Sequence, residues 1–297
     1  MQLTVQDTAP VVDVEQGEER IVRATLRRIW RNKMAVAGLG VIVLMVVVAI
    51  AAPLIAPYDP LAQNILEQTQ PPSGAHLMGT DEFGRDVLSR IIYGTRPSLE
   101  VGFIAVGIAT IAGLIIGVTA GYFGGWVDNL LMRVMDVFFA FPDVVLAIAI
   151  VAMLGSSLFN VMIAIGVVYT PIFARTSRSA VLGVASMQFI EAAQASGSRH
   201  LKIIMRHILP NILAPVIVQV SISFAFAILT EAALSFLGLG TQPPAPSWGQ
   251  MLSGGRQFIY TDVLLSVWPG LAIAVAVLAF NFLGDGLRDA LDPRLER

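Results

Sequence analysis

Residues 137–174 read VFFAFPDVVLAIAIVAMLGSSLFNVMIAIGVVYTPIFA, and Asp143 is the one charged residue among them. A helix rises about 1.5 Å per residue, so a single helix over this run would reach roughly 57 Å, nearly twice the roughly 30 Å hydrocarbon core of a bilayer. The run therefore predicts two membrane-spanning helices. The polar sequence Gly155-Ser156-Ser157 is the expected turn between them.

Four further uncharged runs flank this stretch, and each is long enough for one span of about 20 residues. Together they predict six transmembrane helices, at about residues 34–57, 98–124, 136–155, 158–175, 208–232 and 264–285. The uncharged run 232–255 contains several prolines and glycines. We expect an extramembrane loop there, because irregular backbone leaves polar groups unsatisfied in lipid.

Composition agrees with a membrane protein, since 56% of the 297 residues are hydrophobic and 13% are charged. A soluble domain carries about 25% charged residues. The fold class is therefore an all-α polytopic membrane protein. The first run is about twice as long as the 7–15-residue apolar core of a signal peptide, so we expect an uncleaved span.

Lysine and arginine orient the bundle, because cytoplasmic loops of membrane proteins are enriched in both. With both termini inside, 15 of the 19 lie in cytoplasmic segments. The other four, Arg85, Arg90, Arg96 and Arg256, lie in outer loops. We expect a cytoplasmic tail at residues 1–33, disordered over 1–19. A transmembrane domain at 34–297 follows, with a cytoplasmic loop at 176–207.

Several chemistries are excluded by missing motifs. The chain has no cysteine, and neither Lys33 nor Lys202 closes a phosphate-binding GxxxxGK[ST] loop. The three histidines form no HExxH pattern, and no GxSxG sequence occurs. We therefore expect no catalytic residue, metal site or cofactor on this chain. The net charge of −2 gives no general attraction to nucleic acid.

Glycines recur every fourth residue in the second span, at Gly113, Gly117, Gly121 and Gly125. This spacing puts them on one helix face and predicts close approach of another helix. In the first outer loop, residues 79–94 read GTDEFGRDVLSRIIYG. They predict a surface helix capped by Thr80 or Asp81, which either braces the loop or contacts an external partner.

The longest inner loop contains EAAQASGSRHLKIIMRHILPN, residues 191–211. We predict a short helix, a turn at Gly197, and a second helix ending at Pro210, where the fifth span begins. The second helix is expected to share one apolar face, made of Leu201, Ile204, Met205 and Ile208. Arg199, Lys202 and Arg206 share another face, which would meet either carboxylates of a partner or lipid headgroups.

This loop resembles the EAA loop of bacterial ABC import permeases. The resemblance rests on Glu191-Ala192-Ala193, on Gly197, and on a terminal Leu209-Pro210. His207 stands where the general motif has an apolar residue, as the peptide-importer branch tolerates. Three more blocks are similar to the dipeptide/oligopeptide branch of this family, namely residues 79–94, 231–252 and 280–297. Within that branch the chain resembles the subunit type with a single first span and a short first outer loop.

The resemblance implies a type I ABC importer permease fold and alternating access across the bacterial inner membrane. It implies no ATP or Mg on this chain, since both would bind two separate ATPase subunits. A second homologous permease subunit and an extracytoplasmic solute-binding protein are the other implied partners. The residues implied to couple ATP hydrolysis to transport are Glu191, Ala192, Ala193, Ala195, Gly197, Leu209 and Pro210. Dipeptides or oligopeptides are the default solute, and nickel chelates, glutathione or another small solute remain alternatives.

Two acidic residues lie inside predicted spans, where charges are costly and often functional. Asp143 is expected near the inner end of the third span and Glu231 near the outer end of the fifth. Hydrogen bonding within the bundle is the favoured role for each, with Glu231 the better candidate for the translocation path. An ion-coupled transporter is the less favoured alternative, because we expect no charge at the middle of a span.

Overall fold

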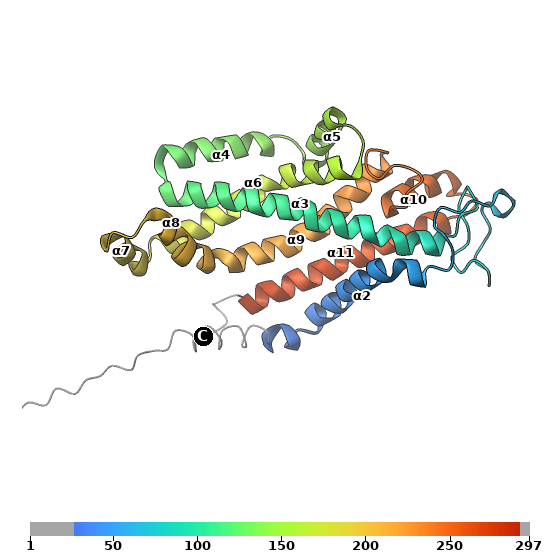
Figure 1. The fold of residues 1–297 in the computed structure, drawn as a ribbon, viewed down its shortest axis with the longest axis horizontal. Coiled ribbons are helices and arrows are strands. Elements are labelled where there is room, and N and C mark those ends of the chain that lie inside the picture. Colours follow the sequence, from blue (N-terminus) through green and yellow to red (C-terminus); the bar gives the residue numbers. More distant parts are fainter. Residues whose placement is uncertain (1–26, 292–297) are drawn as a thin grey trace, which may run out of the picture.

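The computed structural model describes residues 27–291, and these fold into a bundle of long helices without a β-strand (Figure 1). The α-helices are α2 (Lys33–Ile55), α3 (Val87–Phe123), α4 (Gly125–Phe139), α5 (Asp143–Leu154), α6 (Leu158–Ala185), α7 (Gln188–Ala195), α8 (His200–Ile203), α9 (Leu209–Phe236), α10 (Trp248–Gly255) and α11 (Leu264–Leu291). A π-helical turn (Ile204–Ile208) joins α8 to α9, and 3-10 turns occur at Ile65–Glu67 and Arg256–Phe258. The tail predicted to be disordered, 1–19, lies outside the described residues.

Five helical runs are long and apolar enough to cross a membrane: α2, α3, α6, the run His200–Phe236, and α11. The sixth crossing is made by α4 and α5 together, which are bent by 90° at a short break. The predicted third span, 136–155, is therefore not one straight helix. Pro142 explains the break, because proline disfavours helical geometry in the residue before it.

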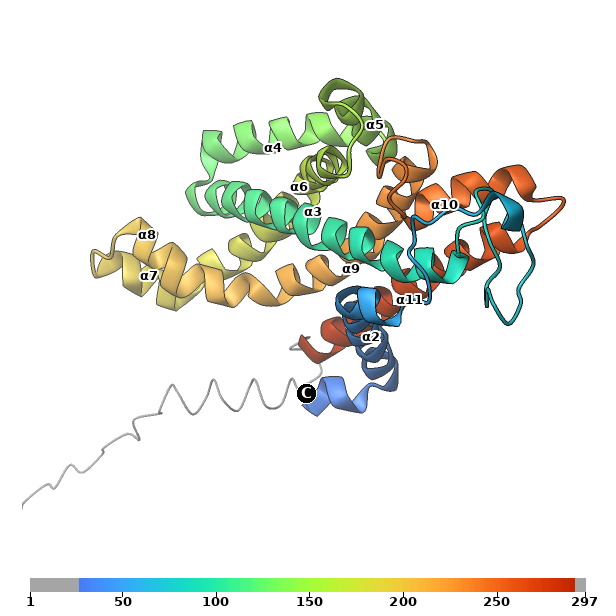
Figure 2. The same cartoon turned by 45° about the vertical axis from the view of Figure 1, so that its right-hand side comes forward.

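The direction of α3 and α6 shows why the segment that connects them must cross the membrane. Residues 105–108 of α3 lie against Gly166, and Gly121 lies against Val181, so the two helices run in the same direction. Between them the chain has to return from the inner end to the outer end. The segment α4–α5 provides this return (Figures 1 and 2).

Three glycines make the α3–α6 contact possible. Gly113 lies against Phe173, Gly117 against the carbonyl oxygen of Ala174, and Gly121 against Val181. A Cβ at any of the three would meet atoms of α6. The predicted close-packing face is confirmed for these positions. Gly125 does not belong to it, because it begins α4 and a Cβ there would meet nothing within 4 Å.

The outer end of α3 differs from the predicted surface helix. Residues from Val87 onward continue without a break into the span, as a single 37-residue helix. At about 1.5 Å per residue this helix is roughly 55 Å long and extends beyond the hydrocarbon core. Its N-cap is Asp86, whose carboxylate accepts from the Ser89 N–H at 2.7 Å, rather than Thr80 or Asp81.

The helices α2 and α11 pack against each other, and they join the bundle through contacts of α2 with α3 and of α11 with α9 (Figure 2). Pro53 inside α2 cannot donate to the carbonyl of Ala49. The guanidinium of Arg96 on α3 donates to this carbonyl instead, at 2.6 Å. A polar group that the proline leaves free in α2 is thus satisfied by the neighbouring helix.

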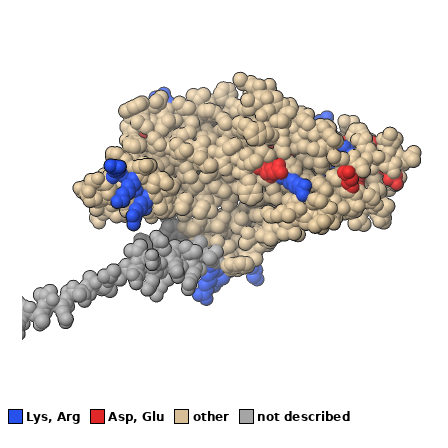
Figure 3. Space-filling model, in the orientation of Figure 1, with Lys and Arg blue, Asp and Glu red and all other residues tan. Residues whose placement is uncertain are grey.

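The two ends of the bundle differ in content. The inner end, at the left of Figure 1, carries α7, α8 and the described ends of the chain. The outer end carries the loop at residues 57–86 together with α10. Figure 3 shows a group of basic atoms at the inner end, whereas most visible acidic atoms lie toward the outer end with a few basic atoms among them, which agrees with the predicted orientation.

Asp143 lies deeper than predicted. The third crossing begins at Gly125 rather than near residue 136, so the carboxylate is carried further along the span. It lines a cavity with Tyr169 and Gln219, which lie in the middle thirds of α6 and α9. The expectation that no charge lies near the middle of a span stays a prediction.

We expect Gly117→Ala to lower the free energy of unfolding by about 1–3 kcal/mol, because its Cβ would overlap the backbone of α6. Gly107→Ala, on the same helix, is the matched control. A Cβ there meets nothing within 4 Å, so alanine should stabilise α3 by about 0.5–1 kcal/mol. Thermal unfolding in detergent measures both, and equal shifts would contradict the packing described.

Candidate functional site

The segment implied to couple to a partner is α7 with the turn that follows it, at the inner end of the bundle (Figure 1). One side of this short helix holds it to the protein. Ile190 is fully buried in a cluster with Val181, Ile203 and Ile208. The other side is open, since Glu191, Ala192 and Ala195 are all exposed.

Gly197 ends α7 in a specific backbone geometry. Its φ is +72°, the Gly197 N–H donates to Gln194 O at 2.9 Å, and the Ser198 N–H donates to Ala193 O at 3.2 Å. These two bonds form a Schellman motif with glycine in the left-handed position. A Cβ at Gly197 would meet nothing within 4 Å, so the requirement for glycine is conformational rather than steric.

Ala193 lies differently from its neighbours. It is half-buried and packs against the cluster around Ile190, whereas Ala192 and Ala195 face outward. The small residues of the segment therefore divide into one that faces the bundle and two that are free to meet a partner.

In residues 200–210 the buried side chains differ from the apolar face that the sequence predicted. Ile208 is fully buried, but Leu201 and Met205 are 71% and 57% exposed, and Ile203 is buried in their place. The helix also does not end at Pro210, since the run from His200 continues to Phe236. Pro210 has no N–H for the carbonyl of Arg206, and the wider π-helical turn lies at this point. Leu209 packs against the buried cluster, and Pro210 is exposed.

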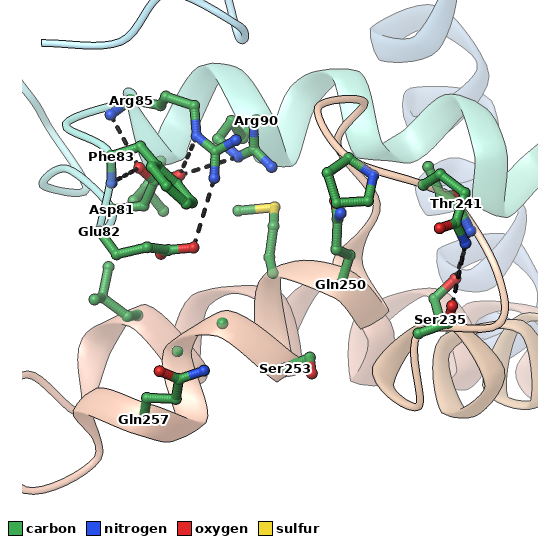
Figure 4. A pocket seen from close by; sticks show the side chains of 18 residues that line it. Asp81, Glu82, Phe83, Arg85, Arg90, Ser235, Thr241, Gln250, Ser253 and Gln257 are labelled. Atoms are coloured by element: carbon green, nitrogen blue, oxygen red, sulfur yellow. Dashed lines mark hydrogen bonds and ion pairs between the residues drawn. The ribbon is translucent and has the colours of Figure 1, made fainter.

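The outer end encloses a cavity of about 320 Å³ (Figure 4). Asp81, Glu82 and Arg85 of the first outer loop line one side, and Gln250 and other residues of α10 line the other. The Arg85 Nε donates to Asp81 Oδ2 at 2.7 Å, and its guanidinium lies 3.6 Å from Glu82 Oε1. The cavity is therefore bordered by a fixed group of opposite charges.

Arg90 ties together the segments around this cavity. The side chain is 2% exposed, and its Nη1 donates to the carbonyl of Pro60 at 3.0 Å and to that of Pro244 at 3.4 Å. Its Nε also lies 3.3 Å from Asp81 Oδ2. One buried guanidinium thus joins α3 to two outer loops that are distant in the sequence. Sequence reasoning placed Arg90 in the outer loop but gave no sign of this role.

Glu231 is fully buried within α9. Its Oε1 accepts from the Ser235 hydroxyl at 2.6 Å, and Ser235 Oγ accepts from the Thr241 N–H at 3.2 Å. This chain of hydrogen bonds joins the end of α9 to the turn after it. A place for Glu231 on the translocation path stays a prediction.

Comparison with known families decides which class of membrane protein this is. The family described as "Binding-protein-dependent transport system inner membrane component" matches residues 113–297. A second family, the "N-terminal TM domain of oligopeptide transport permease C", matches residues 22–72. The chain belongs to the binding-protein-dependent transport permeases. It is accordingly a multi-pass inner-membrane permease subunit of an ABC transporter, as the sequence predicted.

Relatives extend over nearly the whole permease. The dipeptide transport system permease protein DppC of Alkalihalophilus pseudofirmus is 49% identical over 92% of this chain and 90% of its own length. The di/tripeptide transport system permease protein DppC of Pseudomonas aeruginosa is 44% identical over 91% of this chain and 93% of its own. The glutathione transport system permease protein GsiD of Pectobacterium atrosepticum is 42% identical over 97% of this chain and 96% of its own.

The fold is shared with a solved ABC transporter. A chain of the inward-facing MetNI methionine ABC transporter matches 68% of the permease and 96% of its own length. The TM-score is 0.57 at 19% identity. The predicted type I ABC importer permease fold is confirmed.

We expect Gly197→Val to abolish transport while leaving the bundle assembled. A β-branched residue in the left-handed region costs roughly 1–2 kcal/mol, which is enough to change how α7 is presented. Gly197→Asn is the matched control, because asparagine tolerates this region. Uptake by the reconstituted transporter and thermal unfolding measure the two effects, and degradation of Gly197→Val in cells would show a role in folding instead.

We expect Arg90→Met to lower the free energy of unfolding by about 1–3 kcal/mol, because the buried carbonyl of Pro60 loses its donor. Arg256→Met is the control: Arg256 is exposed and stacks on Phe236 with 5.3 Å to the ring centroid, so the loss should be about 0.5–1 kcal/mol. Thermal unfolding with limited proteolysis of the outer loops measures both. If Arg90→Met lowers the free energy of unfolding no more than Arg256→Met does, Arg90 does not hold the outer loops together.

Proposed function

We propose that this permease forms half of the translocation pathway of an ATP-driven importer of dipeptides or oligopeptides, working by alternating access. The observation that carries the proposal is α7. It is a short helix fixed on one side by Ile190, with small exposed residues on the other, at the inner end of a chain related to dipeptide permeases. Such a helix is suited to receive a push or pull from a cytoplasmic partner.

Separate ATPase subunits are the proposed cytoplasmic partners. The sequence contains no phosphate-binding loop, so ATP and Mg would bind those subunits and not this chain. The exposed side of α7 would enter a groove on one ATPase subunit. Closure of an ATPase dimer on ATP would then move α7, and through Ile190 the inner ends of α6 and α9.

A second permease subunit would complete the pathway, since the six crossings of this chain would form one half of it. Outside the membrane, an extracytoplasmic binding protein would deliver the solute. The outer cavity, with its fixed carboxylates and guanidinium groups, offers that binding protein a charged and rigid contact surface.

Glutathione is the second candidate solute. It is a small peptide, and the glutathione permeases GsiD of Pectobacterium atrosepticum and Escherichia coli are 42% and 45% identical to this chain. Uptake of labelled dipeptides, tripeptides and glutathione by cells expressing the complete transporter separates the candidates. Uptake of none of them would overturn the proposed solute class.

We expect Ala192→Asp to release the ATPase subunits, because it would bury a charge without a partner in the proposed contact. A loss of about 2 kcal/mol corresponds to roughly thirtyfold weaker binding. Co-purification of ATPase subunits from detergent measures the loss. Ala193→Asp would be a poor test, since Ala193 packs against the permease itself.

Two controls accompany this variant. Ala245→Asp places the same charge on an exposed alanine at the outer end and should retain the ATPase. Lys202→Ala removes an exposed charge worth about 0–1 kcal/mol and should also retain it. Retention by Ala192→Asp together with loss by Lys202→Ala would show that docking is electrostatic and uses the other half of the segment.

A further inference from the structure

A cavity of about 270 Å³ opens on the side of the bundle formed by α4–α5, α6 and α9. Its polar lining consists of Asp143, Tyr169, Gln219 and Ser223, and Phe139 and Phe226 are among its apolar walls. Tyr169 lies in the middle third of α6, and Gln219 and Ser223 lie in the middle third of α9. The cavity therefore lies partway along both helices, away from their inner and outer ends.

The polar groups of this cavity are only partly satisfied by one another. Gln219 Nε2 donates to Ser223 Oγ at 3.1 Å, and the Tyr169 hydroxyl is paired with Thr230 Oγ1 at 2.8 Å. Asp143 is exposed, and no lysine, arginine or histidine within residues 27–291 forms an ion pair with it. The nearby Arg175 is occupied, because its Nη2 lies 2.6 Å from Asp136.

A carboxylate without a partner does not face hydrocarbon, because the cost of burying the charge in lipid is high. The opposite side of the bundle shows the contrast. There Val43 and Val47 of α2 and Val275 of α11 are exposed in the middle parts of their helices, as suits a surface that meets lipid. The side with Asp143 must instead face water or a polar ligand. The break between α4 and α5 also leaves backbone groups free of helical bonds beside the cavity.

We infer that this cavity is a binding site for the transported solute and that the Asp143 carboxylate accepts hydrogen bonds from the protonated amino group of a peptide. The inference rests on the proposed function for the presence of a peptide. A carboxylate and the side-chain carbonyl of Gln219 are both acceptors, which suits an ammonium group. Ser223 accepts from Gln219 and keeps its hydroxyl hydrogen for a peptide carbonyl. The volume is near the lower limit of about 300 Å³ for ligand sites, which suits the amino-terminal end of a peptide.

Cysteine accessibility tests this inference, because the permease has no cysteine of its own. Ser223→Cys is introduced into the complete transporter in liposomes and treated with cationic or anionic methanethiosulfonate reagents. The mass of this chain reports the modification. Val43→Cys, exposed in the middle part of α2 on the opposite side of the bundle, is the control for a lipid-facing position.

We expect Ser223→Cys to react with both reagents and Val43→Cys to react with neither. At Ser223→Cys the cationic reagent should react about tenfold faster than the anionic reagent, because Asp143 attracts it. Adding a transported dipeptide should slow the reaction. Asp143→Asn should abolish the preference for the cationic reagent, and Asp143→Glu should keep it. Asp143→Asn should also lower the rate of dipeptide uptake about tenfold, while ATP hydrolysis stimulated by the binding protein persists.

Three results would overturn the inference. The first is a Ser223→Cys variant no more reactive than Val43→Cys, the second is a preference for the cationic reagent that survives Asp143→Asn, and the third is a lack of protection by dipeptide. Loss of subunit assembly in Asp143→Asn would show that Asp143 pairs with the second permease subunit instead. Failure of the proposed function looks different, since the transporter would then take up no peptide while the reagent preference at Ser223→Cys remained.

Discussion

The close contact between α3 and α6 constrains the rest of the bundle. Two helices whose backbones touch at Gly113, Gly117 and Gly121 have little freedom to slide or rotate, since neighbouring side chains interlock on both sides. Because these helices are parallel, the chain between them has to recross the membrane. The broken pair α4–α5 follows from that requirement, and the cavity that Asp143 lines lies where this pair is broken.

Prolines leave backbone carbonyls of the long helices without their usual donors, and the structure accommodates each case differently. Pro53 frees the carbonyl of Ala49, and Arg96 of α3 supplies the missing donor. Pro210 frees the carbonyl of Arg206, and a π-helical turn absorbs the change. Arg178 of α6 binds Asp128 in the first turn of α4 through two bonds of 2.5 and 2.6 Å.

The two ends of the permease use different physical means for different tasks. At the outer end, buried charges such as Arg90 fix the loops to one another, which gives a rigid surface. At the inner end, α7 is held mainly by the burial of Ile190 and by the geometry of Gly197. An apolar contact has no directional bonds to break, so a short helix held in this way is able to move with a partner while it stays attached to the bundle.

The sequence by itself determined the membrane class, the approximate positions of the spans, the glycine face of α3, and the helix–turn–helix around Gly197. These features depend on properties that act locally, namely hydrophobic length, residue spacing and the backbone preference of glycine. Only the tertiary structure decided that α3 begins at Val87, that Leu201 and Met205 face outward, and that Asp143 lies in one cavity with Tyr169 and Gln219. Each of these depends on how one helix is positioned against another. A single residue of π-helical widening or an earlier start of a span changes which side chains face inward, and hydrophobicity along the chain does not record it.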